Sequence, residues 1–193
     1  MANGRVITGF SKPYVAVYSN DGTEVSYASG QILARGVSVS LEVEAADDNV
    51  FYADNGAAES AAGVFQEGTL TLTVDGLLPA AEKLILGLPT EGSDGFMEYG
   101  DSMTFPYLGV GFVVRYMSGG VTSYVPVILP KCRFSTPALE AATQEDDIDW
   151  QTQELTAAIL RDDSENHVWK RMGAGETTEA AAEAKIKTAF SIA

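Results

Sequence analysis

The sequence predicts a mainly β (α+β) fold, an antiparallel β-sandwich or barrel-like structure with one packed α-helix and a C-terminal helical extension. Three observations favour this class. Apolar residues recur mostly with period two, turn signals close these runs, and only two segments combine helical spacing with start and stop signals. A chain of 193 residues suits one generous domain that can bury its core without a disulfide or a metal.

Three strands are predicted in the first half of the chain. Residues 12–19 form a short strand that ends at the turn signal Asn20-Asp21-Gly22. Residues 36–45 and 65–74 alternate between apolar and polar side chains, so each strand needs one buried face and one wet face. An antiparallel sheet provides strands of this kind.

A long apolar hairpin is predicted in the middle of the chain. Its strands are residues 105–117 and 121–129, and Ser118-Gly119-Gly120 joins them. Both faces of these strands are apolar over much of their length. We therefore expect the hairpin to be covered on both sides, by a helix of the same subunit or by a neighbouring subunit.

Two helices are predicted. Residues 77–87 have Pro79 near the start and Gly87 at the stop, as helices favour. Residues 177–190 carry acidic and basic residues at the ends that suit the helix dipole, but the apolar stripe is thin, so this helix needs a surface to lean on. Between them, residues 138–144 favour helix by propensity and residues 148–160 alternate as a strand does, and the pattern leaves both interpretations open.

The predicted organisation is one β domain over residues 1–171, followed by a hinge and a short helix over residues 172–193. Inside the domain, residues 46–63 form a long inter-strand loop that is acidic and rich in small residues. Long connections in compact domains are usually functional or disordered. The patch Val50-Phe51-Tyr52 argues against simple disorder, because a solvated loop has no use for adjacent aromatics.

Composition excludes several classes of function. The formal net charge is −15, and a negative surface repels phosphate, so tight nucleic-acid binding requires a hidden basic patch. One cysteine permits neither an internal disulfide nor a thiolate zinc site. The chain has no membrane-length apolar run and no signal-peptide layout at its start, so we expect a soluble protein made in a reducing cytoplasm.

No catalytic, metal-binding or cofactor-binding residue is predicted, and the chain is not expected to be an enzyme. His167, the only histidine, lies in a polar run and is interpreted as a solvated turn residue. Cys132 lies between Lys131 and Arg133 but is interpreted as a small core thiol. The acidic runs are interpreted as solvated loops, because neighbouring carboxylates on a strand point to opposite faces.

A protein of this kind is suited to assembly. A sheet with one wet face can add strands at its edges, so identical copies in a ring could close into one barrel. The long loop and the terminal helix, which are marginally stable alone, would then pack against the next copy. If a nucleic-acid duplex passes through such a channel, the wall should be neutral or negative, because each basic residue adds attraction to phosphate.

Three stretches carry a resemblance to a known family. They are DNVFYADNGAAESAAGVFQEGTLTLTVDGL (residues 48–77), VVRYMSGGVTSYVPVILPKCRFSTP, and ALEAATQEDDIDWQTQELTAAILRDD with Trp169-Lys170 after it. In this order, over nearly the whole chain, they resemble the major tail (tail-tube) protein of long non-contractile-tailed bacteriophages. The resemblance implies a structural virion protein that forms stacked hexameric rings. The inner sheets of those rings form one barrel, the tail tube, through which DNA is ejected.

The resemblance also implies partners and a location. The subunit would bind copies of itself, the tape-measure protein, the tail-terminator protein and distal tail proteins, while double-stranded DNA passes without specific binding. It implies no cofactor and no membrane, and a place in the virion tail after assembly in the host cytoplasm. The helix over residues 78–86 would pack against the sheet, and the loop over residues 46–63 would make the contacts between rings.

Two sets of candidate site residues follow. Stacked acidic rings repel one another, so contacts between them should be apolar or hydrogen-bonded, and the candidates in the loop are Asp48, Val50, Phe51, Tyr52, Asp54 and Asn55. The candidate lumen-facing residues are Ser38, Ser40, Glu42, Glu44, Thr69, Thr71 and Thr73. The same polar face could also look outward.

Three alternatives stay open at this point. A monomeric carbohydrate- or cell-surface-binding β-module would use exposed aromatics such as Tyr99, Tyr107, Tyr116 and Trp150. A tube protein of a bacterial contractile secretion system would share the ring architecture. An acid-pair hydrolase would depend on Asp147 and Asp149.

Overall fold

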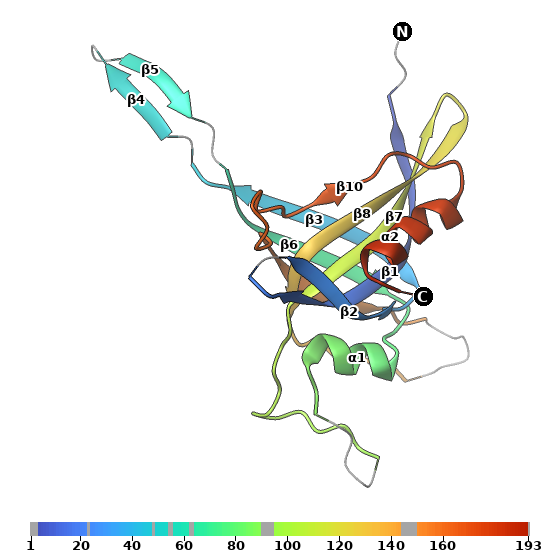
Figure 1. Cartoon of the computed structure of the whole chain (residues 1–193). Coiled ribbons are helices and arrows are strands. Elements are labelled where there is room, and N and C mark those ends of the chain that lie inside the picture. The colour runs from blue at the N-terminus through green and yellow to red at the C-terminus, as the bar shows by residue number, and fades with distance from the viewer. Residues whose placement is uncertain are drawn as a thin grey trace.

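The protein is built around one large antiparallel sheet with two helices, as the sequence predicted (Figure 1). The computed structural model describes residues 4–22, 24–47, 49–53, 56–61, 64–89, 95–143 and 150–192. Within these ranges the main sheet has the strand order β2-β1-β7-β8-β9-β6-β3, and β10 adds to β8. A separate two-stranded sheet, formed by β4 (Asn49–Ala53) and β5 (Gly56–Ala61), projects away from the body (Figure 1).

The first three strands of the sheet are β1 (Val6–Asn20), β2 (Val25–Ile32) and β3 (Gly36–Ala45). The bounds of β3 are those predicted, while β1 begins earlier than the predicted strand. A turn follows β1, where the backbone N–H of Gly22 donates to Asn20 Oδ1 at 2.8 Å and Gly22 has a φ of 89°. Sequence analysis missed β2, which pairs with the second half of β1.

The predicted apolar hairpin is formed by β7 (Leu108–Ser118) and β8 (Val121–Phe134). Gly119 and Gly120 join them with φ values of 57° and 80°, a left-handed turn that glycine adopts without strain. The segment over residues 148–160, for which the pattern left helix and strand open, contains a strand, β9 (Gln153–Leu160). Of the segment over residues 138–144 that favoured helix by propensity, residues 138–143 form no helix, and residue 144 lies outside the described residues.

The core lies on one face of the sheet. β6 (Phe65–Val74), which has its predicted bounds, and β9 contribute alternating apolar residues to it. These residues pack in one cluster with side chains of β1, β7 and β8. The sheet curls so strongly that Phe10 of β1 lies against Gly36 of β3, although four strands separate β1 from β3 in the sheet order. As the alternation in its sequence predicted, β6 therefore buries one face in the core and exposes the other.

Both predicted helices are present. Helix α1 (Pro79–Leu86) starts at its proline, ends at Gly87 in the left-handed region, and buries Ala81, Ile85 and Leu86 in the core. Helix α2 (Glu179–Ala189) is capped by Thr178, whose side chain accepts a hydrogen bond from the Ala181 N–H. Neither helix of the described part of the chain has the length and apolar character that a bilayer crossing requires.

Helix α2 covers the outer face of β1, β7 and β8 (Figure 1). Ile186 and Phe190 are buried there and lie close to Gly109 and Gly111 of β7. The hairpin is therefore covered on both sides, by the core and by a helix of the same subunit. The segment from residue 172 that was expected to act as a hinge is hydrogen-bonded to β8. Strand β10 (Arg171–Met172) pairs with β8, and the Gly173 N–H donates to the Pro126 carbonyl of β8.

Candidate functional site

The main candidate site is a solvent-facing surface that spans four strands, which we call the polar face. It is the side of β3, β6, β9 and the end of β8 that points away from the core. Cross-strand pairing puts Ser38 opposite Thr73, Ser40 opposite Thr71 and Glu42 opposite Thr69. All seven predicted lumen-facing residues therefore lie together on this one face: Ser38, Ser40, Glu42, Glu44, Thr69, Thr71 and Thr73.

The polar face is wider than sequence analysis predicted. Thr71 and Thr73 pair onward with Thr156 and Glu154 of β9, which extends the polar surface by one strand. Thr69 pairs with Ala158, and Ala158 pairs with Arg133 of β8. The row Glu42–Thr69–Ala158–Arg133 thus crosses all four strands.

Arg133 corrects the expectation that this face carries only acidic or uncharged side chains. It is exposed, and within the described ranges its guanidinium has no ion pair, only the Tyr107 ring with its centroid 5.8 Å away. The sequence contains the pattern that predicts this position, because Lys131 and Arg133 alternate with the buried Cys132 and Phe134 and must therefore lie on the opposite face of the strand. Lys131 lies on the same side but is held by Asp163, with Nζ and Oδ2 2.7 Å apart.

Carboxylates outnumber cations on the polar face. Glu42, Glu44 and Glu67 are exposed on β3 and β6, and Glu154 is exposed on β9. Glu44 and Glu67 are directly opposite each other, an arrangement of like charges that disfavours the strand pair. The polar face is therefore acidic towards β3 and basic at the end of β8.

Of the four strands of the polar face, only β3 is an edge strand of the main sheet, and it pairs only with β6 among the described residues. β8 is an interior strand that pairs with β7 as far as Cys132, and only Arg133 and Phe134 extend beyond β7. Unpaired strand edges are templates for adding another strand.

The predicted contact loop over residues 46–63 is itself a hairpin. Val50, Phe51 and Tyr52 lie in β4 (Asn49–Ala53), which pairs with β5 (Gly56–Ala61). Three other candidates, Asp48, Asp54 and Asn55, lie outside the described residues. The period-two pattern of the loop is too short to have predicted these strands.

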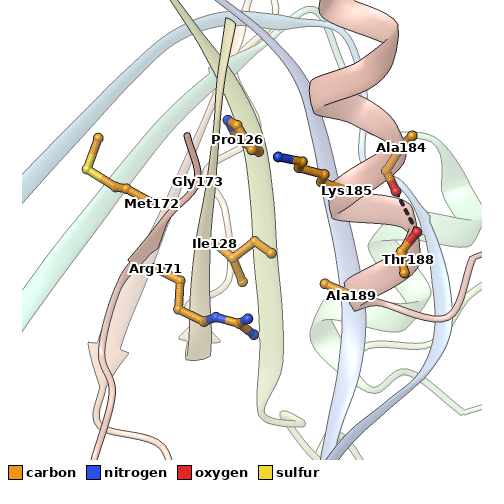
Figure 2. Close-up of a pocket in the computed structure, with 9 residues that line it drawn as sticks. All are labelled: Pro126, Ile128, Arg171, Met172, Gly173, Ala184, Lys185, Thr188 and Ala189. Carbon is orange, nitrogen blue, oxygen red and sulfur yellow. Dashed lines mark hydrogen bonds between the residues drawn. The ribbon is translucent and has the colours of Figure 1, made fainter. Parts of the chain in front are cut away.

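A groove of about 400 Å³ lies between α2 and β10 (Figure 2). Its lining is mostly apolar, with Pro126, Ile128 and Ala189 on its walls. Arg171 and Lys185 are the two cations of the lining, and Lys185 forms an ion pair with Glu176. Among the residues that line this groove there is no carboxylate, thiol or imidazole.

The isolated reactive groups are engaged in structural roles. Burial raises the pKa of the Cys132 thiol well above its ordinary value, so the thiolate is disfavoured. His167 is exposed in a turn at a φ of 48°, with Nδ1 3.4 Å from the Asp162 carbonyl oxygen. Asp162 is buried, and its carboxylate accepts hydrogen bonds from Ser164 and from the Val168 N–H. In the described part of the chain, no three acidic, His or Cys side chains gather as metal ligands would.

The exposed aromatics do not form one platform. Tyr99 donates to Glu82 at 2.7 Å, and this hydrogen bond together with burial raises the pKa of Tyr99 to about 12. Tyr107 lies under Lys131 and Arg133, whereas Arg5 covers the ring of Tyr116. In comparisons with known proteins, no family model and no curated protein matches the chain.

Proposed function

We propose that this protein is a structural subunit that assembles into stacked rings and forms the tail tube of a siphophage-like virion. The observation that carries the proposal is the polar face, a surface of four neighbouring strands on which all seven predicted lumen-facing residues lie. The main sheet ends in two edge strands, β2 and β3, and an unpaired edge strand favours the addition of a strand from a further copy. The strongly curled sheet fits the barrel-like sandwich that the family resemblance implies.

The size of such a ring suits a conduit. If each of six copies, the number that the resemblance implies, lines the lumen with the four strands of its polar face, the barrel has 24 strands. With about 4.8 Å between strands and a tilt of about 40°, the backbone circumference is about 150 Å and the diameter about 48 Å. A lining with four carboxylates and one unpaired arginine per subunit is acidic overall, so DNA would pass without specific binding.

The projecting hairpin β4-β5 supports stacking. It forms a sheet of its own, apart from the main sheet, and an isolated two-stranded hairpin is at best marginally stable in water. A second ring would supply the missing surface. The tape-measure, tail-terminator and distal tail proteins are the further partners that the resemblance suggests for such a tube.

Electron microscopy and sedimentation velocity of the purified full chain over a range of concentrations test the proposal. We expect rings or tubes whose inner barrel has a backbone diameter of about 48 Å, with a bore narrower than this because side chains line it. We also expect deletion of residues 47–62 to leave a folded subunit that no longer forms tubes. A strictly monomeric species, even when it is nucleated with tail-tip complexes, would contradict the proposal. A tape-measure gene downstream would distinguish a phage tail from a contractile secretion system.

A further inference from the structure

The groove between α2 and β10 combines an apolar lining with cations on both walls (Figure 2). Pro126 and Ile128 of β8 are buried and lie between Arg171 of β10 and Lys185 of α2, which are both exposed. The Lys185 ammonium is paired with Glu176, whereas the Arg171 guanidinium has no ion pair with a described residue. The groove therefore suits a partner that presents an apolar side chain next to a carboxylate.

The same chain contains a segment of complementary character. Residues 138–152 have the sequence ALEAATQEDDIDWQT, with five acidic residues and no basic one. Residues 144–149 of this segment lie outside the described residues. Leu139 and Trp150 are the two most exposed large apolar side chains of the described part of the chain, at 91% and 82%. Tryptophan is among the residues that most often anchor protein interfaces, so this segment has the composition of an interface segment.

The described residues of this segment do not fill the groove of their own subunit. The segment follows the end of β8 at Phe134, whereas Ile128 in the groove lies six residues earlier on the same strand. At about 3.3 Å per residue, the groove is about 20 Å from the point where the segment leaves the sheet. Leu139 and Trp150 remain exposed in the subunit, so both are available to the groove of a second copy.

We propose that the groove between α2 and β10 binds the segment over residues 138–152 of a second copy, with Trp150 against Ile128 and the neighbouring carboxylates beside Arg171. An aromatic anchor in an apolar pocket with charge pairs around it is the arrangement that dominates binding energy at protein interfaces. The groove volume of about 400 Å³ is within the range of about 300–1,000 Å³ typical of pockets that enclose a ligand. The contact needs only two copies, so it goes beyond the proposed ring and can be measured without it.

Tryptophan fluorescence of the full chain tests the contact. Trp169→Phe leaves Trp150 as the only tryptophan, and we expect its emission to shift to shorter wavelength as the protein concentration rises. Arg171→Glu in this background should raise the midpoint concentration of the shift about tenfold, because it replaces attraction to the acidic segment with repulsion.

Arg115→Glu is the matched control. Arg115 is also exposed and has no ion pair with a described residue, but it does not line the groove. The same change of charge should therefore move the midpoint less than about twofold, because exposed charges outside the contact are screened by salt. Thermal melting of each variant verifies that the subunit is folded.

Cross-linking tests the same contact independently of charge. Copies with Thr152→Cys, mixed with differently tagged copies with Ala184→Cys in the groove, should give covalent dimers that carry both tags when a short bis-maleimide is added. Ala28→Cys on β2 replaces an exposed alanine outside the groove and should give none. The native Cys132 is buried, so it does not compete for the reagent.

Several outcomes would overturn the contact. They are an emission that does not shift with concentration, a midpoint unchanged by Arg171→Glu or raised equally by Arg115→Glu, and cross-links only within one chain. A monomer that carries a bound anionic amphiphile in native mass spectrometry would assign the groove to a small ligand instead. Rings that form equally well from the wild type and from Arg171→Glu would overturn the contact and leave the proposed function intact. Copies that cross-link through the groove but never form rings would overturn the proposed function alone.

Discussion

Phe190→Ala is expected to release helix α2 from the sheet. The Phe190 side chain is fully buried, at 0% exposure, and its ring centroid lies 4.9 Å from that of Tyr27. It also lies over Gly109 and Gly111, where any added side-chain carbon would clash with it. Truncation to alanine thus removes the largest fully buried side chain of the small core between α2 and the outer face of the sheet.

The expected cost follows from the buried area. A phenylalanine buries at least about 150 Å², which at about 25 cal/mol per Å² corresponds to about 4 kcal/mol, within the range of about 3–5 kcal/mol typical of Phe→Ala in cores. An isolated helix of 11 residues is marginal in water, so α2 cannot remain helical once it is undocked. We therefore expect α2 to unfold locally before the sheet does.

Urea unfolding and amide hydrogen exchange measure this effect. In the Phe190→Ala variant, the amides of α2 should lose protection from exchange while those of β6 and β9 keep it. The free energy of unfolding should fall by about 3–5 kcal/mol. The fall is smaller where the free energy of docking α2 on the sheet is itself below that range, because the loss cannot exceed the docking energy. Thr188→Ala, an exposed change on the same helix, should cost within about 0.5 kcal/mol. A loss below about 1 kcal/mol with α2 still protected would refute the reasoning.

Two further predictions concern titratable groups. Tyr14 Oη donates a hydrogen bond to Glu183 Oε1 at 2.5 Å, and this bond is the main cause that holds the pKa of Glu183 below its ordinary value of 4.5. The ionised Glu183 therefore stabilises the fold above pH 4.5, and this stabilisation is lost as the pH falls through the lower pKa of the folded state. Thermal melting of Glu183→Gln should therefore show lower stability at pH 7 and a weaker dependence on pH below about 5 than the wild type, and equal slopes would contradict this. Burial raises the pKa of Cys132, so we expect its thiol to react with maleimide only after unfolding, and rapid labelling of the native protein would show that the thiol is accessible.

The elements predicted from the sequence are those whose signals are local. β3 and β6 were predicted with their observed bounds because each alternates between apolar and polar side chains along its whole length. The β7-β8 hairpin was predicted because two glycines interrupt a long apolar run. In each case the pattern that buries one face is contained in the segment itself.

The missed elements depend on partners far away in the chain. β2 has the unremarkable sequence VSYASGQI, and it is held by pairing with β1 and by the C-terminal residues Phe190 and Ile192, which pack on Tyr27 and Gly30. β10 is only two residues long and exists because β8 leaves an edge open beside it. The alternation around Cys132 puts Arg133 on the face opposite to Cys132 and Phe134, but only the pairing of β8 with β9 and of β9 with β6 joins that position to Thr69.

The two outer surfaces of the sheet differ in whether another element of the same subunit covers them. Over β1, β7 and β8 the chain supplies its own cover, because α2 brings Ala182, Ile186 and Phe190 onto an apolar surface. Over β3, β6 and β9 it supplies threonines and glutamates. Thr69 is directly opposite Glu42, and Glu67 is directly opposite Glu44, so the pairing of β3 with β6 places no cation opposite either carboxylate. Like charges directly opposite each other disfavour a strand pair, so a cation brought to this surface from outside the subunit would stabilise it. We therefore expect thermal stability to rise with added salt, because salt screens the repulsion between Glu44 and Glu67.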